Sequence, residues 1–115
     1  MRVLHVSSEL APFAQSGGLA DVTAGLSLAE SALGLDVAVL VPLYRGVAER
    51  LAPHRLALGP AIPLPLAVGI HHLDATLHIT DTGQVRYAFV ACPPLFDREG
   101  TLYSCPFNDW LLNRL

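Results

Sequence analysis

The sequence of residues 2–42 is RVLHVSSELAPFAQSGGLADVTAGLSLAESALGLDVAVLVP. Its first five residues are mostly apolar and precede a Ser-Ser pair, which is typical of a buried strand that leads into a loop. The run Asp36-Val-Ala-Val-Leu-Val is almost wholly apolar and is stopped by Pro42, as expected of a parallel strand that is covered on both faces. A predicted helix separates the two segments, so residues 2–42 predict a strand–helix–strand unit with its two strands side by side.

The predicted helix begins near Leu19 and carries apolar residues at steps of three and four. These residues are Leu19, Val22, Leu26, Ala29 and Leu33. The spacing places them on one face, which we expect to pack against another part of the protein, and Gly34 can end the helix. Gly25 costs the helix about 1 kcal/mol relative to alanine. Close approach of a neighbouring element would account for this glycine.

The second half of the chain predicts a β-hairpin. Residues 71–80 alternate between apolar and polar side chains, as in a half-buried strand, and the turn Asp81-Thr-Gly-Gln separates them from a second strand at residues 85–92. Residues 59–65 hold three prolines and indicate an extended connection, whereas residues 64–70 can pair at a sheet edge. Pro93 and Pro94 end the second strand. Near the end of the sequence, Asn108 is a plausible N-cap for a helix over residues 109–115.

Composition excludes several classes of function. The 115 residues make one domain or part of one, and 52% hydrophobic against 15% charged residues is too apolar for disorder. A net charge of -3 offers no general attraction to nucleic acid or to anionic membranes. The longest uncharged run, residues 56–70, is too short and too rich in proline to span a bilayer. The start of the sequence lacks a secretory signal, so we expect a cytoplasmic protein.

The reactive residue types are few. The sequence has no lysine, which excludes amine chemistry such as a Schiff base. Cys92 and Cys105 lack metal-binding spacing and are interpreted as buried, reduced thiols. His72, Asp74 and His78 share one face of a predicted strand, where a solvent-facing stripe is a better interpretation than a metal site. His5 is interpreted as a packed, hydrogen-bonded histidine rather than a base, because nothing nearby in sequence orients it.

Residues 9–22, ELAPFAQSGGLADV, join the first strand to the helix. Gly17 and Gly18 allow a ligand to approach the backbone, and the helix N-terminus that follows offers free N–H groups and a partial positive charge. This arrangement favours an anion such as a phosphate. The alternative interpretation is that the two glycines only make a tight turn.

Three segments together resemble the N-terminal part of bacterial glycogen synthases and plant starch synthases. They are VSSELAPFAQSGGLADV (6–22), LGLDVAVLVPLYRGV (33–47) and PPLFDREGTLY (93–103). The resemblance implies an α/β fold in which residues 1–115 form part of a Rossmann-like domain, the first of two in a GT-B-type glycosyltransferase, with a mostly parallel sheet and a β-hairpin. It also implies transfer of glucose from ADP-glucose to the non-reducing end of an α-1,4-glucan, with retention of configuration and without metal or cofactor.

The resemblance also implies the site residues. The family phrase KTGGL lies on the pyrophosphate of ADP-glucose, so Gly17 and Gly18 would pass close to the donor phosphates, and Glu9 and Asp21 would line the cleft beside them. For Asp21, a favourable interaction with the helix dipole is the alternative role. Gln15 stands where the family has lysine; a neutral hydrogen bond contributes about 1 kcal/mol against roughly 1.5–3 for a charge-assisted one, so donor binding should be weaker.

No catalytic residue is assigned to this chain. The family's catalytic histidine and the donor-gripping residues of its second domain have no counterpart before Leu115, so we expect the 115 residues to be incomplete and inactive alone. Uncovered apolar faces would then drive self-association. Two alternatives are a non-catalytic binding or interaction module derived from such an enzyme, and a two-domain glycosyltransferase with a different sugar nucleotide. Asp97, Arg98, Glu99 and Tyr103 resemble a family loop that lies near the glucan-binding side, and their alternative role is a solvated surface loop with internal ion pairs.

Overall fold

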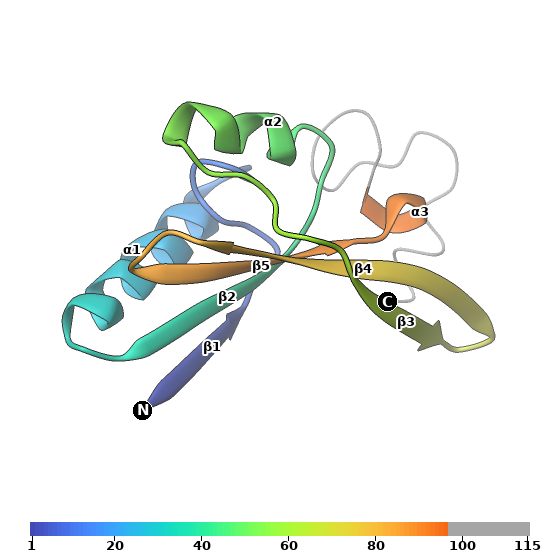
Figure 1. Ribbon diagram of the computed structural model, residues 1–115, viewed down its shortest axis with the longest axis horizontal. Coiled ribbons are helices and arrows are strands. Elements are labelled where there is room, and N and C mark those ends of the chain that lie inside the picture. The colour runs from blue at the N-terminus through green and yellow to red at the C-terminus, as the bar shows by residue number, and fades with distance from the viewer. Residues whose placement is uncertain (97–115) are drawn as a thin grey trace.

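A five-stranded sheet with the order β1-β2-β5-β4-β3 forms the centre of the molecule (Figure 1). The structure, a computed structural model, describes residues 1–96. The strands are β1 (Arg2–Val6), β2 (Asp36–Pro42), β3 (Ile62–Val68), β4 (His71–Asp81) and β5 (Val85–Ala91). The helices are α1 (Gly18–Ala32), α2 (Val47–Leu51) and α3 (Pro93–Phe96), with a 3-10 turn, η1, at Ala52–His54.

The predicted topology is confirmed. Strand β1 pairs in parallel with β2, and β2 pairs in parallel with β5, so the strand–helix–strand unit has its two strands side by side. The hairpin joins β4 to β5 in antiparallel pairing, and β3 pairs with β4 at the sheet edge. The fold is therefore α/β with a mixed sheet, in which the parallel part lies at the N-terminal side.

The core lies on one face of this sheet. The side chains of Val37, Val39 and Val41 in β2 point to the same face as their partners Val85, Tyr87 and Phe89 in β5. Helix α2 adds Val47 and Leu51 to the same buried cluster, and α1 packs against β2 and β5. Both helices therefore cover this one face.

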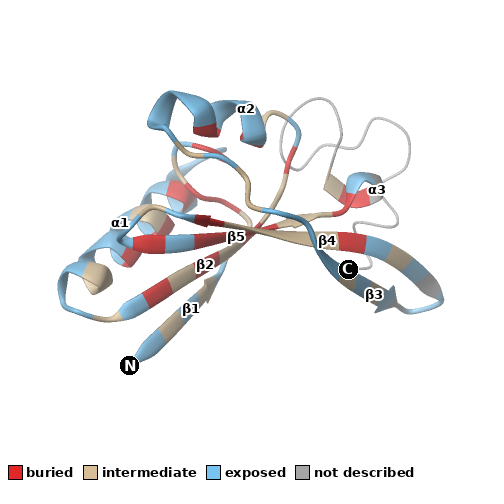
Figure 2. Ribbon diagram, viewed as in Figure 1, coloured by how far each residue is buried: buried red, intermediate tan, exposed pale blue. Residues whose placement is uncertain are grey.

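The face of the helix at residues 18–32 that packs on the sheet is not the apolar face singled out from the sequence. Helix α1 ends where expected, before Gly34, which takes a positive φ of 90°. However, its buried residues are the small Ala20, Thr23 and Ser27, while the predicted face of Leu19, Val22, Leu26, Ala29 and Leu33 is exposed. In Figure 2, α1 is mostly exposed, with short buried segments along it. Small side chains let the helix approach the strands closely, which larger ones would prevent.

The expected explanation for Gly25 is also wrong. A Cβ at this position would meet no atom within 4 Å. Close approach of a neighbour therefore does not account for the glycine within the described part of the chain.

Residues 1–96 cover the sheet at β1 and β2 on one face only, so the expectation that the run at residues 36–41 is covered on both faces is not met within this part of the chain. In β1, Leu4 and Val6 are 60% and 73% exposed. In β2, Ala38, Leu40 and Pro42 are only partly buried. Helix α3 covers another part of this second face of the sheet, where Leu95 packs with Ala75 and Cys92. The β1 end of this face has no such cover among residues 1–96.

Three short elements were not predicted. Helices α2 and α3 and the turn η1 are too brief to produce a periodic pattern. Pro93 and Pro94 end β5 as expected and also begin α3, because proline is tolerated in the first turn of a helix, where its missing N–H has no partner to lose. The predicted helix at 109–115, the loop at 97–103 and Cys105 lie outside the described residues. Within residues 1–96, no helix has the length and apolar character to span a membrane.

Candidate functional site

The loop between β1 and α1 is fixed by buried side chains at its base. Leu10, Phe13 and Ala14 are almost fully buried, and Leu10 and Ala14 exchange two backbone hydrogen bonds of 2.8 Å. The ring of Phe13 packs edge-on against Tyr87, with 5.8 Å between the ring centroids. Residues 15–19, in contrast, are exposed. The loop therefore presents this stretch to solvent from a rigid base at the carboxyl end of β1.

Side chains from the segment after β2 hold the β1–α1 loop in place by hydrogen bonds. Nη1 of Arg50 donates a hydrogen bond to the carbonyl of Phe13 at 2.7 Å, and the Tyr44 hydroxyl donates to the carbonyl of Ser8 at 2.9 Å. The carboxyl ends of β1 and β2 are thus linked. In open α/β sheets, this edge is where ligands bind.

Glu9 lies beneath the glycine turn. Its side chain is buried, and Oε1 accepts hydrogen bonds from the backbone N–H groups of Ser16, at 2.9 Å, and Gly17, at 3.1 Å. The carboxylate therefore joins the end of β1 to the residues that immediately precede α1.

Gly17 and Gly18 border open space. Gly17 is the N-cap of α1 with an extended φ of −167°, and Gly18 is the first residue of the helix. A Cβ added at either position would meet no atom of residues 1–96 within 4 Å, and no side chain of these residues caps the helix. Within residues 1–96, neither a left-handed backbone nor local packing requires glycine here, which does not support the interpretation as a tight turn.

Gln15 and Asp21 contact each other on the exposed side of the same turn. Nε2 of Gln15 donates a hydrogen bond to Oδ2 of Asp21 at 3.0 Å. Asp21 lies in the first turn of α1, where the helix dipole favours a negative charge. The structure thus brings together all five residues that the sequence analysis singled out.

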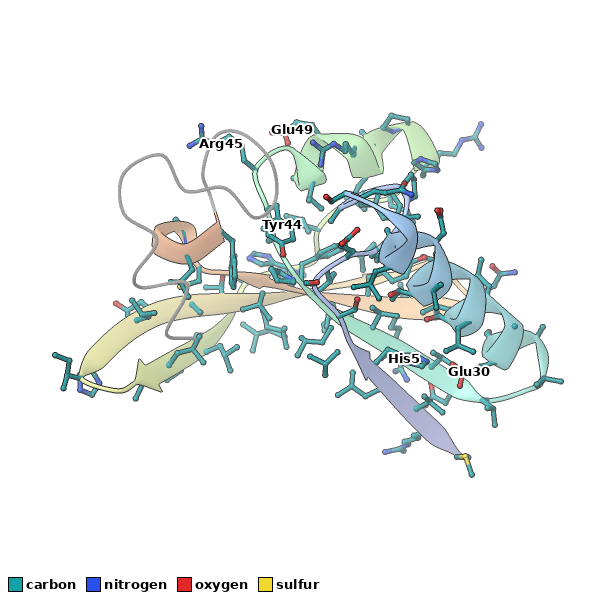
Figure 3. The ribbon with its side chains drawn as sticks, turned by 180° about the vertical axis from the view of Figure 1, so that it is seen from behind. His5, Glu30, Tyr44, Arg45 and Glu49 are labelled. Atoms are coloured by element: carbon teal, nitrogen blue, oxygen red, sulfur yellow. The ribbon has the colours of Figure 1, made fainter. Side chains whose placement is uncertain are left out.

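His5 is a packed, hydrogen-bonded histidine, as predicted. Its Nε2 pairs with Oε1 of Glu30 from α1, 25 residues away in the sequence, and Figure 3 shows the two side chains facing each other. A second contact, 3.1 Å between the hydroxyls of Ser7 and Thr23, joins α1 to the residue that follows β1. These polar contacts attach α1 to β1 where large apolar side chains are missing from the interface.

His78, in β4, is hydrogen-bonded through both sides of its ring. Nδ1 of His78 donates to the carbonyl of Gly59 at 2.9 Å, and Nε2 lies 2.9 Å from the Thr76 hydroxyl. Both ring nitrogens are therefore occupied, while His72 and Asp74 are exposed. Among residues 1–96, no group of three potential ligands could hold a metal ion.

A pocket that the sequence analysis did not predict lies at the carboxyl ends of β2 and β5. Tyr44, Arg45 and Glu49 line it from the β2–α2 segment (Figure 3), and its volume is about 210 Å³. Cys92, a buried free thiol whose pKa is raised by burial, lines it from the end of β5. The position of these residues after two parallel strands is the only sequence signal that could have indicated this pocket.

The chain was compared with known proteins. The family model described as starch synthase catalytic domain matches residues 2–114. A glycogen synthase from Deinococcus deserti is 40% identical over 111 residues, which are 96% of this chain and 22% of that protein. A glycogen synthase from Francisella philomiragia is 36% identical over 108 residues, which are 94% of this chain and 21% of that protein. The resemblance predicted from the three sequence segments is confirmed.

The fold also has a counterpart among solved structures. The catalytic domain of starch synthase IV from Arabidopsis thaliana, bound to ADP and acarbose, superposes with a TM-score of 0.67 at 24% identity, over 90% of this chain and 21% of that one. The fold is thus that of the N-terminal part of a GT-B glycosyltransferase, and the chain spans about a fifth of the length of these relatives. With a family model that matches almost every residue, this chain belongs to the starch synthase catalytic domain family.

Proposed function

We propose that this chain is the N-terminal segment of a glycogen synthase that transfers glucose from ADP-glucose to an α-1,4-glucan. In this proposal, the turn at residues 15–21 faces the phosphates of the donor. The relatives at 35–40% identity are glycogen synthases, and the Arabidopsis neighbour is bound to ADP and acarbose. From the ADP and acarbose bound to that neighbour, we extend the proposal to a nucleotide donor and a glucan acceptor for this chain.

The open space in front of Gly17 and Gly18 is the observation that carries this proposal. Neither backbone conformation nor packing requires glycine at these positions. A side chain there would instead fill the space from which a phosphate could reach the N–H groups at the start of α1. The glycines are therefore explained by a ligand that approaches the backbone.

The other predicted site residues differ in how closely they would approach the donor. Gln15 and Asp21 lie at the exposed rim, where they would meet the donor beside the glycines. Glu9 lies below the turn and supports it. We assign no catalytic residue to this segment, which would supply part of the donor site while other parts of a full-length synthase supply the reacting groups.

Calorimetry with ADP tests the proposal through a pair of matched variants. Gly18→Leu places a side chain in front of the turn, whereas Gly25→Leu places the same side chain on an exposed part of α1. Both positions have room for a side chain, so both variants should keep the circular dichroism spectrum of the wild type. We expect Gly18→Leu to abolish the heat of ADP binding and Gly25→Leu to retain it. Equal binding by both variants would refute the role of the turn.

A non-catalytic binding or interaction module is the second candidate function. The contact between Gln15 and Asp21 favours it, because the residue in place of the family lysine brings no positive charge and already has a partner. A module retained only for contacts with other proteins should bind neither ADP nor maltooligosaccharide. Binding of either ligand in calorimetry therefore favours the synthase segment over the module.

We also propose that the 115-residue chain associates with a second copy of itself through β1. The N–H of Ser7 donates to the carbonyl of Leu40, and the N–H of Asp36 donates to the carbonyl of Met1. Backbone groups of alternate residues point to opposite sides of a strand, so those of Arg2, Leu4 and Val6 point away from β2. No other described strand pairs with this edge.

The two edges of the sheet differ in their capacity to pair. Strand β3, at the other edge, contains Pro63 and Pro65, which have no N–H to offer a further strand. Strand β1 contains no proline and exposes Leu4 and Val6. In an antiparallel pair of β1 strands centred on Leu4, Arg2 would lie opposite Val6 of the second copy, so no like charges would meet.

Light scattering after size-exclusion chromatography tests this association. We expect a dimer for the wild type and a monomer for Leu4→Lys, because lysine on an edge strand opposes pairing. Leu33→Lys is the control, since Leu33 is exposed on α1 away from this edge. A monomeric wild type would refute the dimer.

We further propose a cytoplasmic location, supported by the free thiol of Cys92.

A further inference from the structure

The carboxylate of Glu9 lies beside the proposed phosphate site and is hydrogen-bonded to the backbone of the turn. Glu9 is only 5% exposed, and a buried carboxylate is costly unless hydrogen bonds compensate it. Oε1 receives two such bonds, from the N–H groups of Ser16 and Gly17. The negative charge is therefore directed at the backbone of the turn.

Backbone contacts of Glu9 and of the residues beside it hold Glu9 in place. Its N–H donates to the Ser7 hydroxyl at 3.2 Å, and its carbonyl lies 2.9 Å from the same hydroxyl. The preceding carbonyl, of Ser8, accepts the hydrogen bond from Tyr44, and the following residue, Leu10, is fully buried. The carboxylate therefore extends from a fixed point at the end of β1.

The two hydrogen bonds decide which N–H groups of the junction remain for a ligand. Those of Ser16 and Gly17 point at Glu9 and are not available to a phosphate. Those of Gly18 and Leu19 belong to the first turn of α1, where backbone N–H groups have no partner within the helix. A bound phosphate would therefore meet the helix end and not the turn that precedes it.

We infer that Glu9 is a positioning residue, which fixes the turn at Ser16 and Gly17 and so directs the first N–H groups of α1 toward the donor phosphate. This inference rests on the proposed function, in which the donor binds at this turn. It assigns Glu9 a role without contact to the substrate. A carboxylate in contact with phosphate would repel it, whereas a carboxylate engaged with two N–H groups beneath the turn stabilises the loop.

Amide hydrogen exchange and ADP calorimetry on the 115-residue chain test the inference. In Glu9→Ala, exchange at Ser16 and Gly17 should accelerate about tenfold or more, and ADP affinity should fall by about tenfold. Glu9→Gln keeps an oxygen that accepts hydrogen bonds and loses the charge. It should therefore retain both the protection of the two amides and the ADP affinity within about fivefold. Asp74→Asn, at an exposed position of β4 away from the glycine turn, is the control for removal of one charge.

The possible results are distinguishable. If Glu9→Ala leaves ADP affinity unchanged, or if Glu9→Gln loses affinity while the two amides stay protected, the inference is overturned. In the second case, Glu9 acts through its charge on the ligand. If the wild type binds no ADP, the proposed function fails for this chain, whereas exchange at the two amides still shows whether Glu9 fixes the turn. The Glu9→Gln variant keeps the test valid if Glu9→Ala does not fold.

Discussion

The amide Nε2 of Gln15 lies 3.0 Å from Oδ2 of Asp21, so the residue that replaces the family lysine is hydrogen-bonded to a carboxylate of the same site. A neutral amide cannot offset the charge of that carboxylate. A phosphate that approaches the start of α1 would therefore meet the helix dipole together with the uncompensated charge of Asp21. This contact explains in structural terms why donor binding is expected to be weaker in this chain.

Restoring the positive charge should strengthen nucleotide binding. In Gln15→Lys, the ammonium group would offset the charge of Asp21 and attract the phosphates of ADP. The difference between a charge-assisted and a neutral hydrogen bond, about 1 kcal/mol, corresponds to an increase in ADP affinity of roughly fivefold. Isothermal titration calorimetry at low salt measures this increase directly.

Gln84→Lys is the control for that substitution. Gln84 lies in the exposed turn before β5, away from the glycine turn, and the variant changes the net charge by the same amount. An equal gain in affinity from both variants would mean that net charge, and not the position of residue 15, controls ADP binding.

Substitutions at two neighbouring residues of α1 should differ strongly in their effect on the free energy of unfolding. Ser27 is 1% exposed against the sheet, so Ser27→Leu should overpack the interface and lower the free energy of unfolding by about 1–3 kcal/mol. Leu26 is 48% exposed, so Leu26→Lys should change it by no more than about 0.5 kcal/mol. Urea denaturation followed by circular dichroism measures both values. If Leu26→Lys proved the more damaging of the two, the orientation of α1 described above would be incorrect.

Substitution by alanine should have opposite effects on the free energy of unfolding at Gly59 and at Gly25. A Cβ at Gly59 would lie 2.3 Å from the carbonyl oxygen of Ile79, so Gly59→Ala must displace the segment that covers β4. We expect a loss of about 1–3 kcal/mol in the free energy of unfolding, as for other overpacked sites. Gly25→Ala meets no neighbour and should stabilise the helix by about 0.5–1 kcal/mol. Thermal unfolding of the two variants gives the comparison, and a neutral Gly59→Ala would contradict the close approach to β4.

Local patterns in the sequence were sufficient to predict most of the strands and the long helix. Alternation identified β4, and the apolar runs identified β1 and β2 because strands have a short, regular signature. The orientation of α1 could not be predicted in this way. Its apolar stripe satisfies the helical period, but the face that packs on a sheet depends on which side chains permit close approach. Here these are small residues, assisted by the pair between His5 and Glu30, whose separation of 25 residues hides it from local analysis.

The candidate site was predicted only in part for a similar reason. A glycine pair between a strand and a helix indicates a ligand loop by itself, and Gln15 and Asp21 follow from the resemblance. The role of Glu9 depends on the path of the loop, which the pairing of Leu10 with Ala14 folds back over the carboxylate. Only the folded chain shows that path.

Cys92 should make the stability of the chain fall at alkaline pH. The thiol is 1% exposed, and burial raises its pKa, although a hydrogen bond from the backbone of Leu95 partly opposes this effect. The folded state therefore keeps its proton to a higher pH than the unfolded state does. This contribution to stability is complete below the pKa of an unfolded cysteine, about 8.5, and is lost as the pH rises through the higher pKa of the folded state.

The measurement is the urea midpoint of unfolding from pH 7 to pH 10 for the wild type and for Cys92→Ala. We expect the midpoint of the wild type to fall more steeply above about pH 8.5 than that of the variant. Removal of the buried side chain lowers the stability of Cys92→Ala at every pH. Only the difference in slope therefore reports the thiol, and Cys105, present in both proteins, cancels from it. Parallel curves would mean that Cys92 titrates equally in the folded and unfolded states, and so that it is not shielded from solvent at the end of β5.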